Sequence, residues 1–147
     1  LRTANANILP FDWRATLREF QATIAEYQEA AGDRFDLSPS AKAAQELLDA
    51  LSAFYGDAEA GKLDVGKANT VIQDLARILV PINFCREPRF RHDPAITVPP
   101  LPTIHTATEL DQHADTLGFA LNQLLRGQNR LVAALRQAQR HIALVTG

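Results

Sequence analysis

The sequence predicts an all-α fold, namely a four-helix bundle with a long proline-rich irregular crossover between its third and fourth helices. Apolar residues recur at spacings of three and four along most of the chain, which is the period of one helix face. The alternation typical of strands is missing, except in the short stretch AITV at 95–98. Five of the eight prolines fall between Pro88 and Pro102, where the helical period stops.

The first helix is expected over about residues 12–31. Asp12 has the side chain of a good N-cap, and Gly32 stands where a C-cap glycine is expected. The apolar stripe of this helix consists of Trp13, Leu17, Phe20, Ile24, Tyr27 and Ala31. We expect the stripe to face the core, because its spacing places these residues on one side of the helix.

Two more helices are expected before Pro81. The second covers about residues 39–60, with Ser38 as its N-cap and Pro39 at its first position. Its apolar residues are Leu47, Leu48, Leu51, Phe54, Tyr55 and Ala58. The third covers about residues 64–80 and ends or kinks at Pro81, because proline lacks the N–H that a helix interior needs. The apolar residues in register there are Ala68, Ile72, Leu75, Leu79 and Ile82.

The fourth helix is the longest and is expected over about residues 108–145. Its core stripe, interrupted once by Gln128, consists of Leu110, Ala114, Leu117, Leu121, Leu124, Leu131, Leu135 and Ala138. Acidic residues lie near its start and only arginines follow, in the order Glu109, Asp111, Asp115, Arg126, Arg130, Arg136 and Arg140. We interpret this polarity as complementary to the helix dipole rather than as a nucleic-acid-binding face.

The crossover is expected over residues 83–106. It contains the stretch REPRFRHDP, and we interpret it as an ordered strap that crosses the bundle, stiffened by its prolines. We expect Phe90 to anchor the strap by packing, and Arg91 and His92 to cap helix ends or bridge between them. The alternatives are an active-site loop and a disordered linker.

The bulk composition limits the partners that the chain is expected to have. One domain is the default for 147 residues, and the formal net charge of −2 gives no general basic field for nucleic acid. No apolar run reaches the roughly 20 residues that span a bilayer, so we expect no membrane contact from this segment. The chain begins with Leu1 and shows no signal-peptide pattern, so we expect it to be part of a longer protein.

The sequence lacks the known signatures of catalysis, and we predict no catalytic, cofactor-binding or metal-ligating residue in this chain. It has no glycine-rich phosphate loop, no nucleophile elbow and no His-Glu-x-x-His pair, and its four histidines are dispersed. The candidates for catalytic groups are Cys85, which stands beside Arg86, and the cluster of Arg91, His92 and Asp93. We favour a structural role for both, since neither has a matched partner in the sequence.

Two apolar residues of the last predicted helix fall outside its core stripe. Phe119 lies about 200° around the helix from Leu117, on the side opposite the core. Leu144 also lies off the stripe. The two residues predict a second contact surface on this helix, which would serve another copy of the chain or a neighbouring domain.

The N-terminal stretch LRTANANILPFDW is similar to a known sequence signature. In glutamate-carboxypeptidase-like proteins, a segment of this kind joins the peptidase domain to a C-terminal helical domain. The residues that match are Leu1, Arg2, Ala4, Asn5, Leu9, Pro10, Phe11, Asp12 and Trp13. A second stretch, REPRFRHDP, resembles the family's segment after the third helix, through Pro88, Phe90, Arg91 and His92. The chain as a whole therefore resembles the transferrin-receptor-like dimerisation domain.

This resemblance implies a non-catalytic homodimerisation domain of a co-catalytic zinc peptidase of the glutamate carboxypeptidase type. Its partners would be a second copy and the upstream peptidase domain, which would hold two zinc ions with all their ligands. The protein would be extracytoplasmic, as a secreted, periplasmic or membrane-anchored ectodomain. The family's Lys-Tyr pair for the substrate glutamate has no counterpart in DPAITVPPLPTIHTATEL, so a glutamate-specific pocket is not implied.

Two alternatives remain open at this point. The first is the same dimerisation domain in a catalytically inactive transferrin-receptor-like or scaffolding ectodomain, whose upstream domain lacks the metal ligands. The second is an independent helical enzyme that uses His92 or Cys85.

Overall fold

The computed structural model describes residues 11–84 and 99–146, and this part of the chain is all-α. Its elements are α1 (Trp13–Ala31), the short 3-10 helix η2 (Gly32–Arg34), α2 (Ser38–Glu59), α3 (Val65–Phe84), the 3-10 helix η3 (Pro102–Thr116) and α4 (Leu117–Thr146). The described residues contain no strand. The all-α class predicted from the sequence is confirmed.

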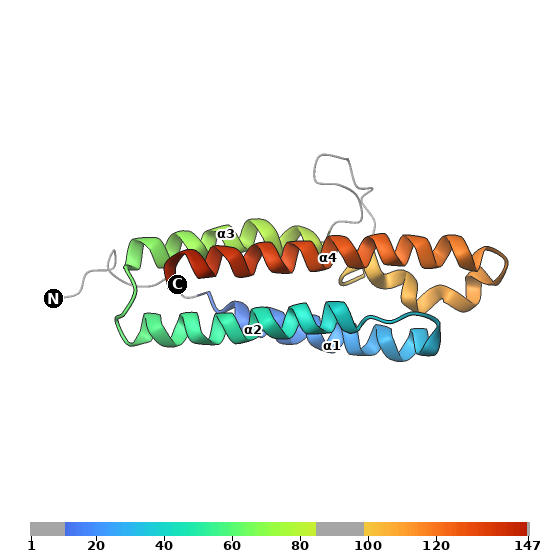
Figure 1. Ribbon diagram of the computed structural model, residues 1–147, viewed down its shortest axis with the longest axis horizontal. Helices are drawn as coiled ribbons and strands as arrows, with labels where there is room; N and C mark the ends of the chain where they lie inside the picture. Colours follow the sequence, from blue (N-terminus) through green and yellow to red (C-terminus); the bar gives the residue numbers. More distant parts are fainter. Residues whose placement is uncertain (1–10, 85–98, 147) are drawn as a thin grey trace.

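The helices lie roughly along one common direction, and α4 is the central element (Figure 1). It contacts α2, α3 and η3, while α1 packs against α2 and η3. Figure 1 shows α3 beside the C-terminal half of α4 and η3 beside its N-terminal half. Helix α4 therefore has η3 as a neighbour along its N-terminal half and α3 as a neighbour along its C-terminal half.

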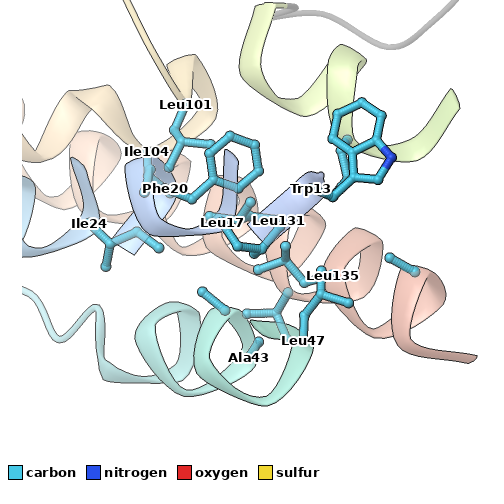
Figure 2. Packing of buried hydrophobic residues seen from close by; sticks show 14 of the residues in the cluster. Trp13, Leu17, Phe20, Ile24, Ala43, Leu47, Leu101, Ile104, Leu131 and Leu135 are labelled. Carbon is cyan, nitrogen blue, oxygen red and sulfur yellow. The ribbon is translucent and has the colours of Figure 1, made fainter. Parts of the chain in front are cut away.

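One cluster of buried apolar residues fills the space between these helices (Figure 2). The predicted core residues that the structure buries are Trp13, Leu17, Phe20, Ile24, Leu47, Leu51, Phe54, Ile72, Leu75, Leu79, Leu124, Leu131 and Leu135. Leu117 and Leu121 are only partly buried at the edge of the cluster. Figure 2 shows Leu101 and Ile104 from the segment before α4 packed close to Phe20.

Helix α1 begins and ends at the two expected caps. The Asp12 carboxylate accepts a hydrogen bond from the Arg14 backbone N–H, and Gly32 donates its N–H to the Gln28 carbonyl. Gly32 adopts φ 60°, a conformation that glycine reaches without steric cost. Both caps are confirmed.

The start of α2 differs from the expectation that Ser38 is its N-cap. Ser38 is the first helical residue, and its backbone N–H is capped by the Asp36 carboxylate at 2.9 Å. The Ser40 backbone N–H and hydroxyl both donate to Oε1 of Gln128, at 3.3 and 2.8 Å. Two acceptors from outside the helix thus satisfy donors that any helix N-terminus leaves free.

The expected end of the third helix near residue 80 is wrong, because α3 continues through Pro81 to Phe84. A proline inside a helix removes one backbone hydrogen bond. Tertiary contacts hold the last turn in place: Leu79 is buried, Ile82 packs against the core, and the Asn83 side chain accepts the Leu101 N–H at 3.0 Å.

The expected single helix over 108–145 is also corrected. Helix α4 begins at Leu117, and residues 102–116 form η3, with non-helical backbone angles at His113. Apart from Pro102, the buried residues of this segment are spaced by three, as Leu101, Ile104, Ala107 and Leu110. In a 3-10 helix, residues three apart lie in one line, so this spacing directs all four side chains into the core. Residues 102–106 of the expected irregular crossover are therefore helical.

Candidate interaction surface

The two apolar residues predicted to lie off the core are among the most exposed in the structure. Phe119 is 66% exposed and Leu144 is 81% exposed. Single exposed apolar side chains are ordinary at a protein surface. What distinguishes this pair is its position along α4, beside the hollows that line this helix.

A groove runs along the seam between α3 and α4. It consists of two hollows, of about 320 Å³ and about 500 Å³, which share Asp74 and His141 in their walls. Its apolar wall residues are Val71, Ile78, Pro81, Ala134, Leu144 and Val145. We call these two hollows the α3–α4 groove. Its walls on α3 extend from Gly66 to Pro81, or about 22 Å at the rise of an α-helix.

The middle of the α3–α4 groove holds Asp74, which contacts residues of both helices. The Asp74 carboxylate lies 3.2 Å from Arg77 Nη1 and 3.5 Å from His141 Nδ1. Asp74 therefore connects a cation of its own helix with an imidazole of α4. Ion pairs at such partly exposed positions contribute little to stability.

A third hollow, of about 690 Å³, lies between η3 and α4. Its lining is mostly polar, as Pro102, Thr103, His105, Thr106, Glu109, His113, Gln123, Arg126, Gly127 and Arg130. We call it the η3–α4 hollow. The Glu109 carboxylate lies 3.4 Å from His105 Nδ1 and 3.7 Å from His113 Nε2, so a single acidic residue stands between the two imidazoles.

All three hollows lie on the same side of α4. Their wall residues on this helix are Gln123, Arg126, Gly127, Arg130, Ala134, Gln137, His141, Leu144 and Val145. Spacings of three and four place them in one stripe, and Phe119 continues that stripe four residues before Gln123. The three hollows together form what we call the α4 furrow. Phe119 and Leu144 lie near its two ends, about 37 Å apart along the helix axis.

The charge gradient expected along one helix is divided between two elements. Glu109, Asp111 and Asp115 belong to η3, whereas α4 has no acidic residue and carries all four arginines of its region. The dipole interpretation is wrong as stated, because the first turn of α4 has no acid and its last turn no base. The arginines of α4 therefore need another explanation.

Phe11 and Trp13, at the start of the first described segment, are fixed to two helices. The Phe11 carbonyl accepts the Tyr55 hydroxyl at 2.6 Å, and the Trp13 indole N–H donates to the Ile72 carbonyl at 3.2 Å. The Phe11 and Trp13 rings stack with centroids 5.8 Å apart. The start of α1 is thus tied to both α2 and α3.

The other residues singled out in the sequence lie outside the described residues. These are the expected crossover anchor of Phe90, Arg91 and His92, the neighbouring Pro88 and Asp93, the single cysteine Cys85 with Arg86, and the signature residues Leu1, Arg2, Ala4, Asn5, Leu9 and Pro10. Within residues 11–84 and 99–146, no group of three or more His, Cys, Asp or Glu side chains is arranged to hold a metal ion. None of the helices in the described part has the length and hydrophobicity to cross a membrane.

The sequence interpretation missed the η3–α4 hollow. The signal in the sequence that could have revealed it is the three-residue spacing of Leu101, Ile104, Ala107 and Leu110. This spacing indicates that His105 and His113 belong to a 3-10 helix and not to the α-helix that follows. A scan against family models, a search of curated proteins and a search of solved structures each returned no match.

Proposed function

We propose that this chain is a non-catalytic homodimerisation domain of a zinc peptidase of the glutamate carboxypeptidase type. In this proposal the chain is a four-helix bundle with a proline-rich crossover, and it associates with a second copy and with an upstream peptidase domain. The two zinc ions and their ligands belong to that upstream domain. The chain itself supplies association and no chemistry.

The observation that carries the proposal is the position of Phe119 and Leu144. Both side chains are exposed, and both lie on the stripe of α4 that lines the furrow. A furrow bounded by helices is a natural seat for another helix, because side chains of one helix pack into the grooves of its neighbours. In a two-fold dimer the same surface is used on both copies, so the furrow of each copy would face the furrow of the other.

A second observation supports the domain junction. The part of the N-terminal signature that is described, Phe11, Asp12 and Trp13, binds α2 and α3 through Tyr55 and Ile72. Such anchoring would hold a preceding domain at a fixed orientation to the helices. This is what a domain that positions two peptidase subunits requires.

The proposal is tested by comparing charged substitutions on two faces of α4. Leu144→Asp and Phe119→Asp are expected to weaken self-association without loss of helicity, because each places a carboxylate at the proposed contact. Leu125→Asp is the matched control, since Leu125 is 46% exposed on the same helix but does not line the furrow. Light scattering after size-exclusion chromatography measures the effect.

Equal self-association of the furrow variants and the Leu125→Asp control would contradict the proposal. If Leu125→Asp weakens association as much as Leu144→Asp does, the contact is not at the furrow. If Phe119→Asp lowers helicity, its side chain supports the monomer instead. The scaffolding alternative shares this dimer, and the sequence upstream of the chain decides between the two by the presence or loss of zinc-ligating residues.

A further inference from the structure

We propose that the η3–α4 hollow binds a small oxyanion ligand, one that carries two or more phosphate or carboxylate groups. The residues that would hold it are Arg126 and Arg130 of α4, with His113 of η3 on the opposite wall. The η3–α4 hollow lies between Phe119 and Leu144 along the α4 furrow, so this inference concerns the chain whose furrow is not occupied by a second copy.

The arginines of the hollow are available to a ligand. Arg126 and Arg130 are exposed and four residues apart, so they project from one side of α4 into the same hollow. Neither makes an ion pair within the described residues. Guanidinium groups bind carboxylate and phosphate oxygens through paired N–H donors, which makes two adjacent arginines an effective anion clamp.

The opposite wall carries titratable and polar groups, and both ring nitrogens of His105 already contact Glu109 and Thr108. The imidazoles of His105 and His113 lie on the two sides of Glu109, which is the one carboxylate among the lining residues. The walls also carry the amide of Gln123 and the hydroxyl of Thr106. The charged and titratable groups facing the hollow are therefore two arginines, two histidines and one glutamate, a balance that favours an anion.

The geometry of the hollow sets the ligand's size. Its volume of about 690 Å³ lies within the roughly 300–1,000 Å³ typical of small-molecule sites. The two walls are held together where the Thr103 backbone closes on Gly127 without space for a side chain. The Thr103 hydroxyl is buried there and has no hydrogen-bond partner within the described chain. The hollow is thus preformed on one side by tight backbone packing.

Calorimetric titration of the 147-residue chain with pyrophosphate, and separately with citrate, tests the proposal at constant ionic strength. Binding of either probe supports the site, and the stronger of the two identifies whether phosphate or carboxylate is preferred. Arg126→Gln/Arg130→Gln is expected to weaken binding about tenfold or more, the loss expected from removing charged hydrogen bonds. Circular dichroism checks that this variant keeps its fold.

The matched control is Arg136→Gln/Arg140→Gln, which removes the same charge from the same helix outside the hollow. If both double variants weaken probe binding equally, the probe is attracted generally to a basic helix and the proposed site is overturned. The absence of binding at millimolar probe concentration would also overturn it. Glu109→Gln is expected to tighten binding, because its carboxylate repels an anion; weaker binding in that variant counts against the proposal.

A proton NMR titration locates the ligand independently of any substitution. The imidazole resonances of His105 and His113 are expected to shift with added pyrophosphate, whereas that of His141, in the α3–α4 groove, is expected to stay in place. A shift of His141 alone would move the ligand to the other end of the furrow and contradict the assignment.

Discussion

The backbone carbonyl of Thr103 lies directly against Gly127, where a Cβ atom would stand 1.8 Å from the carbonyl oxygen. This contact brings the start of η3 onto α4 and closes one end of the η3–α4 hollow. Only glycine leaves room for so close an approach of two backbones. Gly127 is therefore required for the packing of η3 on α4.

Gly127→Ala is expected to destabilise the protein by about 1–3 kcal/mol, because the new methyl group must displace backbone atoms. The measurement is chemical denaturation followed by circular dichroism. Gly118→Ala on the same helix is the control, since no atom lies within 4 Å of its Cβ position. That variant is expected to be unchanged or more stable by up to about 1 kcal/mol. Equal stability of the two variants would show that η3 does not pack on α4 in this way.

Gln128 is the buried polar residue that the sequence showed only as a break in an apolar stripe. Its amide accepts from Ser40 at Oε1 and donates to the Asp36 carbonyl at 3.2 Å. Gln128→Leu keeps the volume but leaves these groups without partners, which is expected to cost about 1–3 kcal/mol.

A double-mutant cycle with Ser40→Ala separates the hydroxyl hydrogen bond from the rest. Ser40→Ala alone is expected to cost about 1 kcal/mol, and its effect is expected to shrink in the Gln128→Leu background because the shared bond is already lost. Additive effects in unfolding experiments would mean that the two residues do not interact.

Tyr27 is expected to make stability fall at high pH. Burial raises the pKa of its phenol to about 12, with a smaller contribution from the nearby Glu26 carboxylate, against an ordinary value of 10.0. The phenol also donates a hydrogen bond to the Pro100 carbonyl. Between about pH 10 and about pH 12 the unfolded chain releases this proton while the folded chain keeps it, so stability is present below pH 10 and lost as pH approaches 12.

The measurement is the ultraviolet titration of tyrosinate at 295 nm. The Tyr27 transition is expected near pH 12, and Tyr27→Phe is expected to remove it. A transition of Tyr27 near pH 10 in the folded protein would show that the phenol is solvated.

Leu75 and Leu121 were both expected to be core residues, and the structure separates them. Leu75 is fully buried, whereas Leu121 is partly exposed at the edge of the core. Leu75→Asp is expected to unfold the protein, because a buried unpaired carboxylate costs about 4 kcal/mol or more. Leu121→Asp is expected to leave a folded protein of lower stability. Thermal unfolding monitored at 222 nm distinguishes the two, and the reverse order would mean that the helical phase of α4 is different.

The sequence predicted most accurately those elements whose local signals agree. In α1 the stripe from Trp13 to Ala31, the Asp12 cap and the Gly32 cap all indicate the same helix, and the structure has it. Local chemistry was sufficient there, because capping and periodicity act within a few residues. The all-α class follows from the same signals.

The deviations arise where tertiary contacts override local preference. Pro81 is kept inside α3 by the packing of its neighbours. The apolar residues of η3 repeat every three residues, and this repeat is easily taken for the start of the α-helical stripe that follows in α4. Ala114, which was expected in the core of a continuous α-helix, is exposed because it lies in η3. The η3–α4 hollow needs His105 and Arg126 to meet across two elements, and no spacing in the sequence predicts such a meeting.

Sedimentation equilibrium of the 147-residue chain at micromolar concentrations tests the central claim most directly. The account predicts a mass that approaches twice that of the 16.2 kDa chain as concentration rises, with the association weakened by Leu144→Asp. A mass of one chain over the whole concentration range would contradict homodimerisation through the α4 furrow.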